Sequence, residues 1–109
     1  NAAATCLRML EKIEALGELD DDNTEQMATF VRAVAIKEEH AQKVKDQLYL
    51  LWSDYFKPEH LEKFPDLHNT FWLAIKQASA VKQHVSREES EKLIASVAGI
   101  ADIFAQSKQ

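Results

Sequence analysis

The sequence predicts an all-α fold, and three observations predict it. Glycine and proline supply only two residues each among 109, so little of the turn chemistry of a strand-rich fold is present. Apolar residues recur at steps of three and four along most of the chain, which is the period of an α-helix. The length suits one domain, so we expect residues 1–109 to form a single antiparallel helical bundle.

We expect four main helices and one short helical segment. The main helices are predicted at about residues 3–16, 24–56, 65–85 and 87–105, and the short segment near 58–64. Gly17 should end the first helix, because glycine accepts the left-handed conformation of a helix C-cap. Pro65 should stop the short segment, since the residue before a proline disfavours the helical conformation. Ser86 and Glu89 form a capping box, which predicts that Ser86 caps the last helix.

The second predicted helix is longer than a compact bundle of this size needs. At about 1.5 Å per residue it would span roughly 45–50 Å. Its apolar line runs to Val34 and resumes at Ala41, and the charged residues Lys37 and Glu38 lie between them. We therefore expect either a bend or break near Lys37–His40, or an end that overhangs the neighbouring helices.

Aromatic residues concentrate in the stretch from Leu48 to Ile75. It holds seven of the nine in the chain: Tyr49, Trp52, Tyr55, Phe56, Phe64, Phe71 and Trp72. Large aromatic side chains bury the most area per residue, so the joint between the second and third main helices should be the tightest part of the core. The stretch also carries more apolar surface than one helical face can hide, which favours one or two exposed aromatic anchors of an interface.

These features favour a non-catalytic function. We predict a helical protein–protein interaction or regulatory module that self-associates as a homodimer through the long second helix. The interface candidates are Ile36, Leu50, Trp52, Phe56 and Trp72. The alternative is a carrier or sensor that binds an apolar small molecule near the aromatic joint between the second and third main helices.

No pattern in the sequence indicates a metal or catalytic site. The four histidines lack the Glu-x-x-His spacing of di-iron bundles: His40, His60, His68 and His84. Cys6 is the only cysteine and lies on an apolar helical face, so a buried packing thiol is the simplest interpretation. We therefore expect no cofactor, no metal and no enzyme activity.

Negative charge concentrates near the start of the chain. Residues 1–30 hold two basic and seven acidic residues, whereas residues 31–109 hold eleven of each, for a net charge of −5. The Asp20–Asp22 run lacks the spacing and glycine of an EF-hand and should help to cap the second helix. Without a basic stripe or an apolar span, we expect no nucleic-acid partner, no membrane partner and a cytoplasmic location. The first residue is not Met, so we expect a processed or excised chain.

Overall fold

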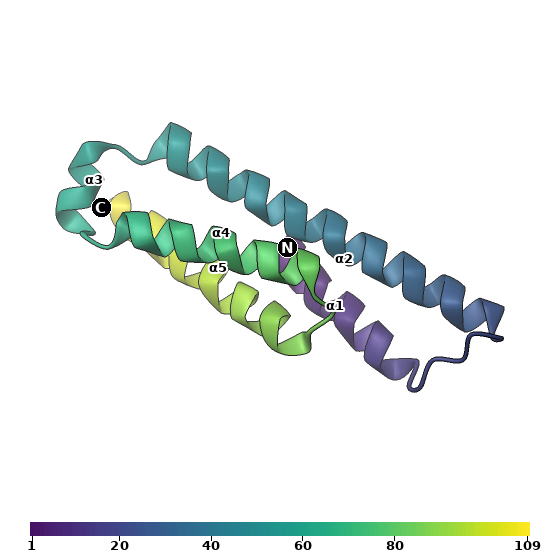
Figure 1. The fold of residues 1–109 in the computed structure, drawn as a ribbon. Coiled ribbons are helices and arrows are strands. Elements are labelled where there is room, and N and C mark those ends of the chain that lie inside the picture. The colour runs from purple at the N-terminus through teal and green to yellow at the C-terminus, as the bar shows by residue number, and fades with distance from the viewer.

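The computed structural model describes residues 1–109 as an elongated bundle of 58 × 20 × 19 Å. Figure 1 shows the long helices lying along one axis, with the short α3 across one end. The elements are α1 (Ala2–Ala15), α2 (Thr24–Leu50), the π-helical turn η1 (Leu51–Tyr55), α3 (Pro58–Lys63), α4 (Leu67–Gln83) and α5 (Arg87–Ser107). The predicted all-α bundle of four main helices with a short fifth segment is confirmed.

The helix ends follow the local capping signals. Gly17 has φ +67°, the left-handed conformation expected just after α1. Asn23 caps α2 by accepting a hydrogen bond from Gln26 N at 3.0 Å. Ser86 caps α5 as predicted, because its Oγ accepts from Glu89 N at 3.2 Å. The Glu89 carboxylate does not return this bond, since it accepts from the Gln77 side chain on α4 instead.

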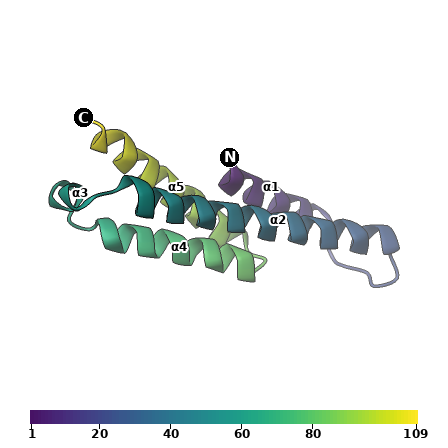
Figure 2. The same ribbon diagram turned by 90° about the horizontal axis from the view of Figure 1, so that it is seen from above.

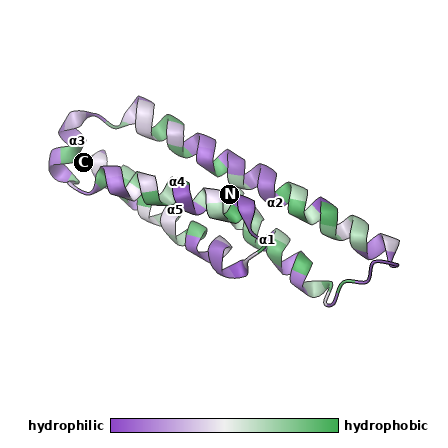
Figure 3. Cartoon of the chain, in the orientation of Figure 1, coloured by the Kyte–Doolittle hydropathy of each residue, from purple (hydrophilic) through white to green (hydrophobic).

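The buried core runs along the facing sides of α1, α2, α4 and α5. Phe71 and Leu93 are almost fully buried, and Leu48 belongs to the same core cluster. Leu51 and Val97 pack against this cluster from its margin. Each long helix shows hydrophobic and hydrophilic residues intermixed along its length in Figure 3, as an amphipathic helix does. None of the helices combines the length and the apolar character needed to cross a membrane.

The expected break near Lys37–His40 is wrong, and the overhang expected as its alternative is present. α2 is one continuous helix from Thr24 to Leu50. Figures 1 and 2 show its N-terminal half, together with α1, extending beyond the ends of α4 and α5. The helix ends six residues before the predicted residue 56, because the backbone widens into the π-helical turn η1.

Lys37 does not interrupt the core line, because its side chain is buried and its ammonium is paired. The residue is 1% exposed, and Nζ donates to the carbonyl oxygens of Lys82 at 3.2 Å and His84 at 2.9 Å. Both carbonyls lie at the C-terminal end of α4, where a helix leaves acceptors without intrahelical partners. The four-carbon stem of Lys37 therefore continues the apolar line of α2, while its ammonium donates to the free carbonyl oxygens at the C-terminal end of α4.

Candidate functional site

The aromatic stretch forms a continuous ring cluster at the α3 end of the bundle. In the π-helical turn, Phe56 N donates to Leu51 O at 3.3 Å. This hydrogen bond joins residues five apart, which is the spacing of a π-helix, whereas an α-helix joins residues four apart. The Trp52 ring centroid lies 4.9 Å from that of Phe71, and the Tyr55 centroid lies 4.9 Å from that of Phe56. π-Helical turns occur often at functional sites, which makes this end the first candidate region.

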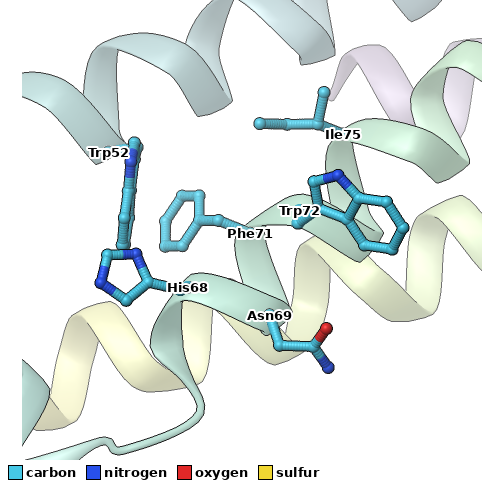
Figure 4. A pocket seen from close by; sticks show the side chains of 6 residues that line it. All are labelled: Trp52, His68, Asn69, Phe71, Trp72 and Ile75. Atoms are coloured by element: carbon cyan, nitrogen blue, oxygen red, sulfur yellow. The ribbon is translucent and has the colours of Figure 1, made fainter.

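An open groove of about 520 Å³ lies beside this cluster. Figure 4 shows its lining residues: Trp52, His68, Asn69, Phe71, Trp72 and Ile75. The imidazole of His68 meets the Trp52 ring edge-on, with centroids 4.8 Å apart. The phenyl ring of Phe71 stands between the two tryptophans, and the indole of Trp72 points away from Trp52.

The predicted interface residues separate into two environments. Trp52 and Phe56 are half-buried and pack against the core, whereas Leu50 and Trp72 remain 60% and 58% exposed. Ile36 lies fourteen residues before Leu50 on α2 and is 37% exposed. The structure thus brings Trp52, Phe56 and the neighbouring Trp72 to one end of the bundle, and it leaves Ile36 apart from them.

No set of side chains in the chain forms a metal site. The structure contains no group of three or more histidine, cysteine, aspartate or glutamate residues that could hold a metal ion. His60 Nδ1 accepts a hydrogen bond from Lys57 N at 2.9 Å, and His40 Nδ1 lies 2.9 Å from the Ile36 carbonyl oxygen. His68 packs on Trp52, and His84 ends α4. His60, His68 and His84 therefore serve helix ends and packing, and His40 contacts a backbone carbonyl within α2.

Cys6 is a buried thiol with a structural partner. Its residue is fully buried, and Sγ donates to the Lys37 carbonyl oxygen at 3.5 Å. Burial raises the pKa of the Cys6 thiol above its ordinary value, although the nearby Lys37 ammonium opposes the shift. Burial likewise lowers the pKa of the Lys37 ammonium. A thiol that stays protonated is a poor nucleophile and a poor metal ligand.

Comparison with known proteins assigns the chain to a family. Residues 1–108 match the sequence model of the nickel-containing superoxide dismutases. The chain belongs to this family. The match takes in every helix described above, so the assignment rests on the entire bundle and not on a local motif.

Two curated relatives are both named as nickel superoxide dismutases. The protein of Streptomyces seoulensis is 40% identical over 79 residues, which cover 72% of this chain and 60% of the relative. The protein of Streptomyces coelicolor is 40% identical over 78 residues, with the same coverage of each chain. The matched part therefore spans about three fifths of the length of these relatives.

Solved nickel superoxide dismutase structures share the fold. The native structure superposes with a TM-score of 0.85 at 34% identity, covering 98% of this chain and 85% of that chain. A structure with nickel ligation of the oxidised state gives 0.85 at 36% identity, with the same coverage. An apo structure gives 0.73 at 32% identity, covering 97% and 95% of the two chains.

The family assignment corrects the functional prediction from sequence. A non-catalytic interaction or regulatory module is wrong, and so are the carrier alternative and the expectation of no enzyme activity, because the family is a family of enzymes. Composition and spacing gave no sign of this chemistry, since the chain contains no recognisable donor set. Imidazole nitrogens bind nickel well, and Ni(II) favours several donors in a square-planar or tetragonal arrangement. The lone buried thiol and the scattered imidazoles of these residues do not fit a nickel ion.

Proposed function

We propose that this chain is the helical bundle of a superoxide dismutase. In that reaction two superoxide anions and two protons give one molecule of dioxygen and one of hydrogen peroxide. The supporting observation is the family match over residues 1–108, joined to a TM-score of 0.85 with a native nickel superoxide dismutase at 34% identity. At that identity the likeness extends to sequence as well as fold.

We further propose that the nickel ion is held by residues other than these 109. Bound nickel would supply the one-electron redox chemistry that disproportionation needs. None of the residues described here forms a donor set for it, and the relatives extend well beyond the part that this chain matches. The role of the bundle in this proposal is to provide a rigid frame.

The environment of Cys6 suits a protein that works beside hydrogen peroxide. Peroxide oxidises thiolates that solvent can reach, and the Cys6 thiol is buried with a raised pKa. The frame therefore exposes no reactive thiol of its own to the product.

The test is a superoxide-consumption assay on the full natural polypeptide that contains this bundle, purified with nickel. We expect rapid loss of superoxide, abolished when nickel is removed with a chelator and restored when it is returned. The matched control is the 109-residue chain under the same nickel conditions, which we expect to be inactive. A full polypeptide with one nickel per chain and no activity above free nickel would contradict the proposal.

Self-association is a separate proposal, and exposed apolar side chains support it. Ile36, Leu50 and Trp72 all remain solvent-exposed, and apolar residues that gather into an exposed patch mark interaction sites. We propose a homodimer that covers part of α2. Sedimentation should show a mass that rises with concentration, reduced by Ile36→Glu and unchanged by Glu38→Gln. A monomer at every concentration would exclude it.

A further inference from the structure

Aromatic rings form an unbroken path from the groove to the end of α5. The path begins at Trp52, whose ring centroid lies 4.9 Å from Phe71, and continues 5.3 Å to Phe56. From Phe56 it passes 4.9 Å to Tyr55, which in turn lies 4.7 Å from Phe104 on α5. A shorter branch joins Trp52 directly to Phe56 at 6.5 Å. Rings at such separations are in van der Waals contact.

The path has one indole and one phenol that lose electrons readily. Tryptophan and tyrosine are the aromatic side chains that one-electron oxidants attack, whereas phenylalanine is far harder to oxidise. Trp52 lines the open groove, so a small oxidant in solution can reach it. The phenylalanine rings of the path link Trp52 to Tyr55 without holding a radical themselves.

The hydroxyl group of Tyr55 is placed to release a proton. Its oxygen lies 2.8 Å from Ser107 Oγ, and Ser107 Oγ donates to the Phe104 carbonyl oxygen at 2.6 Å. Because the serine proton is engaged with that carbonyl, the phenol must be the donor in the bond between Tyr55 and Ser107. Ser107 lies in the last turn of α5, where water can take over the proton.

We propose that Trp52 and Tyr55 form a radical-transfer pair that carries an oxidising equivalent from the groove to Tyr55, beside the C-terminal end of α5. An oxidising radical first takes an electron and a proton from Trp52 and leaves a neutral indolyl radical. An electron then moves from Tyr55 to Trp52, the phenol proton leaves towards Ser107 and water, and the indole recovers a proton from water. The products are an intact indole and a tyrosyl radical.

The use of this pair rests on the proposed function. A superoxide dismutase is surrounded by superoxide, which is itself a one-electron reductant. One superoxide anion and one proton convert the tyrosyl radical back to tyrosine and release dioxygen. The pair would thus protect the bundle from radicals at the expense of the substrate.

The chain supplies its own controls, because it has two tryptophans and two tyrosines. Trp52 and Tyr55 lie on the path, whereas Trp72 and Tyr49 make no ring contact with it and are 58% and 46% exposed. Replacement of each by phenylalanine keeps a ring in place. Exposure alone therefore favours Trp72 and Tyr49 as oxidation sites, while the ring path favours transfer between Trp52 and Tyr55.

The test is pulse radiolysis of the protein with azide radical, a one-electron oxidant that attacks indoles. We expect the indolyl absorption to decay as the tyrosyl absorption rises, at a rate independent of protein concentration. Tyr55→Phe and Trp52→Phe should each abolish that rise, and Tyr49→Phe and Trp72→Phe should preserve it. A rise that depends on protein concentration, or that is lost with Tyr49→Phe and kept with Tyr55→Phe, would overturn the proposal.

This experiment needs neither nickel nor superoxide disproportionation, so its result is independent of the proposed function. Circular dichroism of each variant verifies that the helices remain. If a variant fails to fold, the rate of the tyrosyl rise in the unmodified protein still distinguishes the outcomes, because transfer within one molecule does not depend on protein concentration.

Discussion

The middle of the bundle buries a charged side chain, whereas its α3 end exposes a large apolar one. In the middle, the charged side chain of Lys37 is buried and paired with two carbonyl oxygens. At the α3 end, the large aromatic side chain of Trp72 is 58% exposed and Trp52 is only half-buried. Burial therefore follows what each position can pair or pack with, more than residue type alone.

Removal of the one fully buried aromatic ring should cause the largest loss of stability. Phe71 is 1% exposed and contacts Trp52 and Phe56, so Phe71→Ala should lower the free energy of unfolding by roughly 3–5 kcal/mol. The neighbouring Trp72→Ala serves as the control and should cost less than about 1 kcal/mol. Urea denaturation measures both, and equal losses would show that the groove is not exposed in solution.

The buried lysine gives the next largest effect. Lys37→Met keeps an apolar stem of similar length but leaves the carbonyl oxygens of Lys82 and His84 without their donor. We expect a loss on the order of 2 kcal/mol at neutral pH. The exposed Lys43→Met on the same helix should be near neutral, since its salt bridge with Glu39 is solvated. If Lys37→Met were as stable as the unmodified protein, the hydrogen bonds of the Lys37 ammonium would not contribute to stability.

The pH dependence of the same variant sharpens the comparison. Burial lowers the pKa of Lys37 in the folded state below the 10.5 of a free lysine, so the unfolded chain binds more protons between the two values. The Lys37 contribution to stability should therefore increase as pH rises through that window, and Lys37→Met should lack the increase. Cys6 has the opposite sign, because its raised pKa makes its contribution fall as pH rises. Urea denaturation at a series of pH values gives the free energy of unfolding of both proteins, and the difference between them is the contribution of Lys37. A difference that does not change with pH would contradict the lowered pKa of Lys37.

The smallest effect concerns the helix cap beside the buried lysine. Ser86→Ala removes the hydrogen bond to Glu89 N and should cost about 1 kcal/mol. Ser96→Ala is the control, because Ser96 Oγ only donates to the Lys92 carbonyl oxygen on an exposed helical face. The two midpoints of thermal unfolding should differ, and coincident midpoints would show that the cap adds nothing.

Local patterns in the sequence predicted most of the fold. The spacing of apolar residues located four main helices, and Gly17 and Ser86 marked ends that the structure confirms. Lys37 was misread because its partners lie more than forty residues away in sequence, where no periodicity can register them. The π-helical turn at Leu51–Tyr55 was missed because it looks like continued helix in the sequence.

The candidate site was far less predictable than the fold. The structure brings Trp52, Phe56 and Trp72 to one end of the bundle, and their pattern in the sequence indicated a binding surface, which stays a prediction. The enzyme family could not be inferred from donor spacing, because no donor set occurs among these residues. Only similarity over the whole length of the bundle carried that information.

Nickel binding by the 109-residue chain tests the central claim most directly. Equilibrium dialysis against nickel ions, followed by metal analysis, should find no tight site, and Cys6→Ser should behave like the unmodified chain because the thiol is buried. The full natural polypeptide, dialysed in parallel, should retain one nickel per chain. Tight one-to-one binding by the 109 residues, lost in Cys6→Ser, would contradict the account and place the metal inside the bundle.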